Sequence, residues 1–354
     1  MKRLLKLLIP VLMVVILSSC NSVLVYHMDV LRPGAFVASS DKNSILLADN
    51  SGIQPPQFGH VILESNRYKQ DTSFQTKPLS GILLKSVSDY LWNEHCYKQI
   101  SLCERKDNPF RKDGEEDFLH SGKLTAPQIK TLGKSGRVDL LVSLDRLVIF
   151  SKTNVRPYDV LFRATRDVAV NSVWRVFDVS TDSLLAQFQY NDSLYWEAFS
   201  NGPKSAMKAL PPMEETLPEI GDVVGGHVYK FFGPYWESVA RSYFSSGSFR
   251  MNYAADCVHQ NDWEGAAALW KEEFVKGSGR SVYRAAINMM LYSEFSGDPN
   301  EALAWGKKAE EAMGKLKSGA TVSDRLLYWA YLDSLRTRAL EFEKLKVYFN
   351  GHLN

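Results

Sequence analysis

The sequence is poor in the features that usually indicate a specific chemistry. Its 354 residues include only four cysteines, and 42 Lys and Arg residues nearly balance 40 Asp and Glu residues, for a formal net charge of +2. The low cysteine count excludes a disulfide-rich miniprotein, and the balanced charge argues against a general attraction to nucleic acid. A composition of 45% hydrophobic and 23% charged residues predicts a folded chain of about two domains.

Signatures of the common enzyme mechanisms are missing as well. The chain has no His-Glu-x-x-His pair and no Gly-x-Ser-x-Gly elbow. Before Gly202-Pro203-Lys204-Ser205, Ala198 stands where a phosphate-binding loop requires glycine. The seven histidines are scattered along the chain, and no ligand spacing predicts a metal site. We therefore predict no catalytic residue, no metal and no cofactor.

One long apolar run lies at the N-terminus. Three cations in Met1–Lys6 precede the apolar segment Leu7–Leu17. As a helix this segment would be about 16 Å long, roughly half the thickness of a bilayer core. The pattern is typical of a secretory signal peptide, not of a membrane span.

The residues that follow, Leu17-Ser18-Ser19-Cys20, resemble the lipobox of bacterial lipoproteins. The resemblance implies a signal peptide at 1–19, lipidation of Cys20 and a lipidated tether at 20–43. Two or three acyl chains anchor stably where one binds reversibly. A plain secretory signal with a coincidental cysteine is the alternative. Asn21 stands where aspartate marks inner-membrane retention, which favours the outer membrane, facing the periplasm.

Three cysteines remain, Cys96, Cys103 and Cys257. Three thiols cannot all pair within one chain in an oxidising compartment. Cys96 and Cys103 are close enough in sequence to form a disulfide across a helix end. Reduced, buried thiols are the alternative.

Residues 44–233 alternate short apolar runs with helical periods, which predicts an α+β or α/β domain with a mixed sheet. The polar stretch Glu104–Lys123 is expected to be a surface excursion. Tyr195-Trp196-Glu197 is expected to lie in an irregular stretch, and it is a better candidate for an exposed aromatic contact than the tryptophans of the C-terminal helices. We expect strands at 45–48, 138–150, 167–179 and 184–190, with a hairpin turn at 180–183, and helices at 81–95, 125–135 and 218–232.

A domain boundary is expected at Gly233-Pro234, because proline interrupts the helical pattern. Residues 234–354 are then predicted to be entirely helical, starting with a connecting helix at 235–247. Asn261–Trp270 aligns with Gly297–Trp305 at a shift of 36 residues, and each copy follows a helical stretch. This period is typical of tetratricopeptide-like repeats. Ser323–Phe349 would cap them.

Five residues are expected to pack the repeat helices together. Ala266 and Ala302 are small enough for paired helices to approach closely. The large rings of Trp263, Trp270 and Trp305 are expected to lock neighbouring helices, in preference to forming a carbohydrate-binding platform.

Two wider resemblances concern architecture. The strand Gly136–Val142 and the hairpin that begins at Trp174–Val179 resemble the α/β domain of curli-export lipoproteins and of lipoprotein activators of peptidoglycan synthases, although Val138 and Ser183 replace the usual alanine and glycine. The whole chain is similar to an uncharacterised family of Bacteroidetes lipoproteins, through His27–Pro33, Pro234-Tyr235-Trp236 and the repeat motifs. These resemblances imply architecture and compartment but no chemistry.

We therefore predict a non-enzymatic cell-envelope lipoprotein that binds another envelope protein as an adaptor or scaffold. Its partners would be the membrane, through the lipid, and that protein, with no nucleic acid. An enzyme of cell-wall or glycan metabolism is one alternative, and a secretion-associated lipoprotein is another. The adaptor hypothesis predicts no pocket in the α/β domain that gathers two or more ionisable side chains, whereas an enzyme would need one.

Overall fold

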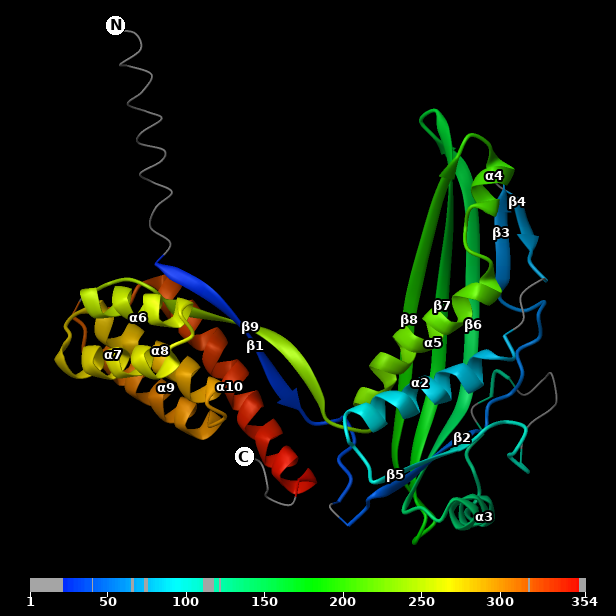
Figure 1. Ribbon diagram of the computed structural model, residues 1–354, viewed down its shortest axis with the longest axis horizontal. Coiled ribbons are helices and arrows are strands. Elements are labelled where there is room, and N and C mark those ends of the chain that lie inside the picture. The colour runs from blue at the N-terminus through cyan, green and yellow to red at the C-terminus, as the bar shows by residue number, and fades with distance from the viewer. Residues whose placement is uncertain are drawn as a thin grey trace, which may run out of the picture. The chain divides into compact units, whose positions relative to one another are not determined.

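The computed structural model describes residues 22–349, except 40, 65–66, 73–75, 111–117, 121 and 318. The chain forms two compact units: one from Pro33 to Tyr235, and one that joins the residues up to Arg32 to those from Trp236 onward. The first is a mixed sheet with helices, and the chain after 248 is helical (Figure 1). The predicted fold class is confirmed. The predicted signal peptide and Cys20 lie outside the described residues.

A seven-stranded sheet forms the first unit, organised by the long strand β6 (Leu140–Tyr158). On one side of β6, its beginning pairs in parallel with β2 (Ser44–Asp49) and a later part pairs in parallel with β3 (His60–Glu64). Beyond these lie β5 (Gln99–Cys103), parallel to β2, and β4 (Arg67–Gln70), antiparallel to β3. On the other side, β7 (Leu161–Asp178) and then β8 (Ser183–Ser200) run antiparallel to their neighbours.

Alternating side chains give the parallel part of this sheet two packed faces. Ile45 and Leu47 belong to the core under α2 (Leu79–Asn93) and α5 (Met213–Val228), whereas Leu46 and Ala48 belong to the core under α3 (Ala126–Gly136). Thr125 is the N-cap of α3, which lies where the sequence predicted a helix. A short 3-10 helix, η1 (Tyr229–Phe231), follows α5, and α4 (Pro203–Lys208) packs on the far part of the long strands.

The second unit combines a two-stranded ribbon with five helices. Strand β1 (Val23–Arg32) pairs with β9 (Tyr235–Phe244). The side chains of Ser248, Asp262, Asp298 and Thr321 each accept a backbone N–H at a helix start, which is why the chain turns at these points. The helices are α6 (Phe249–His259), α7 (Trp263–Lys276), α8 (Arg280–Phe295), α9 (Pro299–Gly314) and α10 (Val322–Tyr348).

The five residues predicted to pack the repeat helices all lie in the core of this unit. Ala266, Trp270 and Ala302 are completely buried, and Trp263 and Trp305 nearly so. The four helices α6–α9 lie where the sequence predicted the two helix pairs. Their likeness to tetratricopeptide repeats stays a prediction.

Two predicted segments near the unit boundary are wrong. The expected connecting helix at 235–247 is strand β9, and residues 23–32 of the expected tether are strand β1. Each strand exists because it pairs with the other across more than 200 residues of sequence, which local periodicity cannot indicate. Met28 and Val30 of β1 are buried in the helical core, so the chain after Ser22 is an integral part of this unit.

The long strands also differ from their predicted bounds. Strands β6, β7 and β8 each extend about six to ten residues beyond or before the predicted segments, and Tyr195-Trp196-Glu197 lies inside β8, not in an irregular stretch. Strands β3, β4 and β5 and helix α4 were not predicted, because each is only four to six residues long.

Cys96 and Cys103, which the sequence suggested could form a disulfide, are both free thiols in the structure. Cys96 packs in the core under α2, with its Sγ 3.9 Å from the Pro234 carbonyl oxygen, whereas Cys103 belongs to the core under α3. The two sulfurs are not bonded to each other, because β5 lies between these cores. Within the described part of the chain, no helix combines the length and apolar character needed to cross a bilayer.

Candidate functional site

A pocket of about 430 Å³ lies where the parallel strands β2 and β5 end. Ala48 of β2 is aligned with Cys103 of β5, so the residues that follow these strands emerge at one edge of the sheet. The first turn of α2 begins at the same edge. The lining consists of Asp49, Ile53, Lys77, Pro78, Ser80, Gly81, Glu104, Arg105 and Lys106.

Asp49 carries the most unusual group of this pocket. Its side chain is 1% exposed, and its Oδ1 accepts hydrogen bonds from Ser51 Oγ at 2.6 Å and Ser51 N at 3.0 Å. Its Oδ2 is buried and has no hydrogen-bond partner among the described residues. A buried, unsatisfied carboxylate oxygen is costly for a folded protein, so the site is suited to a ligand that donates a hydrogen bond.

A helix start and three basic side chains also line the pocket. Helix α2 starts at Pro78 without a side-chain cap and has no acidic residue in its first turn, so its positive dipole end is open to the pocket. Lys77 is exposed beside it. Arg105 donates to the Ser51 carbonyl oxygen, and Lys106 pairs with Glu104 at 3.0 Å. The start of α2 and Lys77 can accept the anionic group of a ligand.

A buried polar network supports the turn that holds Asp49. Asp145 accepts hydrogen bonds from Asn50 Nδ2 at 2.6 Å and Ser143 Oγ at 2.9 Å, and it pairs with Arg175. A register shift between Leu144 and Arg146 places Asp145 in this position. Burial raises the pKa of Asp145, while its hydrogen bonds and Arg175 oppose that shift. Asn50, adjacent to Asp49, is thereby fixed.

The pocket contradicts one prediction. Asp49, Lys77, Glu104, Arg105 and Lys106 are five ionisable lining residues, whereas the adaptor hypothesis predicted no pocket with two. The lining contains no His or Cys, and among the described residues Ser80 has no hydrogen bond to a basic side chain. Among the described residues no group of three side chains suits a metal ion. The arrangement can bind and orient a polar ligand.

A second candidate surface is the outward face of β6, β7 and β8. Helices α2 and α5 lie on the other face of these long strands, where Phe188 of β8 stacks on Phe231 at 4.8 Å (Figure 1). On the outward face, Tyr195 and Phe199 of β8 are 49% and 44% exposed, and Tyr158, the last residue of β6, is 55% exposed. Apart from α3, no helix that the structure describes covers this outward face.

Cross-strand contacts order these outward side chains. Arg163 of β7 binds Glu197 through Nε at 2.9 Å and Nη2 at 2.7 Å, and its Nη2 also donates to Tyr195 Oη at 2.7 Å. The rings of Tyr158 and Phe199 are 5.5 Å apart in an edge-to-face arrangement. The result is a flat surface of preorganised aromatic and polar groups, which loses little entropy when it binds.

Comparison with known families assigns most of the first unit. The model of the Domain of unknown function (DUF8603) matches residues 43–244, more than half of the chain. The chain belongs to this family. Within this DUF8603 protein, a second model, the Domain of unknown function (DUF6340), matches residues 252–337 of the helical part. No curated protein matches the chain.

The chain is distantly similar to several solved structures. The PelC dodecamer from Paraburkholderia phytofirmans shows 6% identity and a TM-score of 0.27, covering 59% of this chain and 99% of that chain. A neuraminyllactose-binding hemagglutinin homolog from Helicobacter pylori shows 8% identity and a TM-score of 0.27, covering 54% and 86%. Protein XCC0632 from Xanthomonas campestris shows 13% identity and a TM-score of 0.24, covering 54% and 87%. These TM-scores support no functional argument.

Sequence reasoning missed the pocket of this DUF8603 protein. The sequence predicts a strand that ends at residue 48 and a surface excursion at Glu104–Lys123, but no site that joins them. The local signal was present, since polar residues follow an apolar strand at Asp49. The parallel alignment of β2 with β5, which brings Glu104–Lys106 beside Asp49, required the tertiary structure.

Proposed function

We propose that the protein is a non-enzymatic cell-envelope lipoprotein that binds another envelope protein through the outward face and edge of β6, β7 and β8. The observation that carries this proposal is the exposed aromatic and polar surface around Tyr195, Phe199 and Tyr158. Clustered exposed aromatic side chains are typical of interaction sites, whereas single exposed ones are ordinary.

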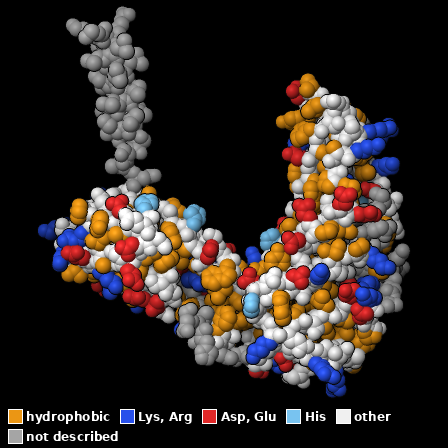
Figure 2. Space-filling model, viewed as in Figure 1, with side chains coloured by type: hydrophobic (Ala, Val, Ile, Leu, Met, Phe, Trp, Pro, Cys, Tyr) orange, Lys and Arg blue, Asp and Glu red, His pale blue; other side chains and the backbone are white. Residues whose placement is uncertain are grey.

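The free edge of β8 supports the same function. The strand is 18 residues long, and among the strands that the structure describes it pairs with β7 alone. It contains no Lys, Pro or Gly, the residues that commonly protect sheet edges, and Asp192 and Glu197 are its only charged residues. Figure 2 shows hydrophobic side chains along the margin of the sheet that β8 forms. An extended segment of a partner can add to this edge through backbone hydrogen bonds.

Anchoring follows from the lipobox resemblance of Leu17–Cys20. In this proposal, Cys20 carries the lipid and holds the chain on the outer membrane, facing the periplasm. Cys20→Ala is expected to move the protein from the membrane pellet to the soluble fraction after a carbonate wash. Retention of Cys20→Ala in the pellet would contradict the lipid anchor.

Partner binding is tested by cross-linking in intact envelopes, followed by purification and mass spectrometry. Tyr195→Glu and Phe199→Glu, made together, place two charges on the outward face without removing a buried group, and we expect them to abolish recovery of the partner. Trp329→Glu in α10, which alters a side chain of similar exposure, is the matched control. Equal recovery with both variants would exclude this face as the binding surface.

The pocket at Asp49 favours a second function, recognition of a small ligand. Asp49 Oδ2 and the open start of α2 suit a molecule that carries an ammonium or hydroxyl group together with a carboxylate or phosphate. Thermal unfolding with panels of amino acids and sugar phosphates provides the test, because a ligand that binds the folded state raises Tm. A stabilising compound should lose its effect with Lys77→Glu, whereas an unchanged effect would place its site elsewhere.

A further inference from the structure

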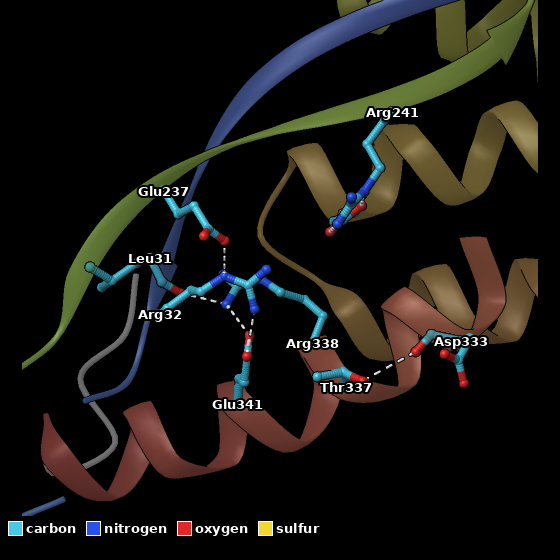
Figure 3. A network of polar contacts seen from close by, with 9 residues as sticks. Leu31, Arg32, Glu237, Arg241, Asp333, Thr337, Arg338 and Glu341 are labelled. Atoms are coloured by element: carbon cyan, nitrogen blue, oxygen red, sulfur yellow. Dashed lines mark hydrogen bonds and ion pairs between the residues drawn. The ribbon is translucent and has the colours of Figure 1, made fainter. Parts of the chain in front are cut away.

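Strand β1 is fixed to the helical unit at both of its ends. At the start, Ser245 N donates to the Ser22 carbonyl oxygen at 3.1 Å. At the other end, Arg32 pairs with Glu237 of β9 and with Glu341 of α10, the latter at 2.6 Å (Figure 3). Arg338 of α10 donates to the Leu31 carbonyl oxygen. The described chain therefore begins on a rigid element.

This attachment leaves little chain between Cys20 and the helical unit. Cys20 is two residues before Ser22 in the sequence, and two residues span at most about 7 Å. If Cys20 carries the lipid, the bilayer surface must lie close to the end of the ribbon formed by Ser22 and Ser245. The anchor thus determines which end of the helical unit meets the membrane.

Exposed aromatic side chains lie next to this end. Only Ser245–Ser248 separate β9 from α6, whose first residue, Phe249, is 84% exposed. Tyr253, one turn further, is 53% exposed, and the two rings stack with centroids 6.3 Å apart. Large aromatic rings so exposed are unusual in water, but they suit the interfacial region of a bilayer.

Neighbouring helices contribute apolar and basic groups to the same end. Arg250 of α6 pairs with Glu272 of α7 at 3.3 Å, which places the last turn of α7 beside the start of α6. In that turn, Val275 is 77% exposed. Gly247 lies near the start of α8, because a Cβ at Gly247 would be 3.7 Å from Ser281 Cβ. The adjacent Arg280 is exposed and can attract anionic headgroups.

We propose that the surface formed by Phe249, Tyr253, Val275 and Arg280 inserts into the headgroup region of the membrane that holds the lipid anchor. This inference rests on the proposed lipidation of Cys20. The binding partner of this surface is a lipid bilayer, because the short connection between a lipidated Cys20 and Ser22 holds the bilayer next to it. The lipid chains hold the protein, and the surface fixes the orientation of the helical unit.

Depth measurement with a spin label tests this contact. Phe249→Cys and, as a control, Trp329→Cys are each labelled with a nitroxide in the lipidated protein, whose other described cysteines are buried. The proteins are reconstituted into vesicles of phosphatidylethanolamine and phosphatidylglycerol. We expect the ratio of oxygen to nickel-chelate accessibility at position 249 to exceed that at 329 several-fold.

The outcomes separate the two proposals. Equal accessibility ratios at 249 and 329 in a vesicle-bound protein would overturn the membrane contact and leave the lipid anchor intact. Cys20→Ala protein that still binds these vesicles as fully as the lipidated form would instead contradict the anchor. As an independent check, Phe249→Ser with Tyr253→Ser should remain vesicle-bound through the lipid but lose the hydrogen-exchange protection of residues 245–253 that membrane binding confers.

Discussion

Helices α2 and α5 approach each other so closely that one methyl group should separate them. A Cβ at Gly225 would lie 2.7 Å from Ser86 Cβ and 3.2 Å from the backbone nitrogen of Val87. Ordinary carbon contacts are about 3.5–4.0 Å, so Gly225→Ala requires the helices to move apart by roughly 1 Å. Rotation of the Ser86 side chain cannot relieve this, because its Cβ and the backbone are fixed.

Two effects of opposite sign set the size of the change. Overpacking of this kind costs about 1–3 kcal/mol, whereas alanine is favoured over glycine in a helix by about 0.5–1 kcal/mol. We therefore expect Gly225→Ala to lower the free energy of unfolding by about 0.5–2 kcal/mol. Gly81→Ala in α2 is the control, because a Cβ there would meet nothing within 4 Å. It should be neutral or stabilise by up to about 1 kcal/mol.

Urea-dependent hydrogen exchange of peptides from α2 and α5 measures this stability separately from that of the helical unit. The peptides should exchange through global opening at lower urea in Gly225→Ala and at equal or higher urea in Gly81→Ala. If both variants shift in the same direction, or if Gly225→Ala matches the unchanged protein, the close packing of α2 on α5 is refuted.

Three further predictions concern other sites. Ala302→Leu should lower the free energy of unfolding by about 1–3 kcal/mol, because Ala302 is completely buried. Glu301→Leu, at the exposed neighbouring position, should change this free energy by no more than about 0.5 kcal/mol. Urea unfolding measures both values. Burial lowers the pKa of His60 to about 4, so between pH 6.5 and 4 the unfolded state binds more protons than the folded state, and the free energy of unfolding should fall as the pH drops through this range. His60→Gln should flatten this pH dependence in urea titrations, and an unchanged slope would contradict the low pKa of His60. Burial raises the pKa of the Cys103 thiol to about 11, so iodoacetamide should modify it only after unfolding, and rapid native labelling seen by mass spectrometry would contradict its burial.

Local signals explain which parts of the fold could be predicted. Helix α3 was predicted because Thr125 is an N-cap and Pro127 is tolerated in the first turn, and the structure adds Gln128 as the second half of a capping box. Helices α7 and α9 begin at Asp262 and Asp298 for the same kind of reason. These signals act over four residues and need no tertiary partner.

The parts that could not be predicted depend on distant partners. Strand β9 has an aromatic, partly polar sequence that is compatible with a helix, and only β1 makes it a strand. Asp145 and Arg146 interrupt the apolar pattern of β6, yet the register shift there turns Asp145 toward Arg175, 30 residues away. The pocket likewise depends on two loops that β2 and β5 align. Local periodicity carries no information about such pairings.

The pairing of β1 with β9 makes the α/β unit an insertion within the helical unit. As the chain is synthesised, the helical unit cannot complete its core until the whole insert has emerged, because Met28 and Val30 pack against residues that follow Trp236 in the chain. A fragment that starts at Tyr235 lacks these two side chains and leaves β9 unpaired. Since Arg32 and Glu237 are in contact, a short turn that replaces residues 33–235 can close the ribbon. We expect such a deletion to leave the ribbon and the five helices as one unit.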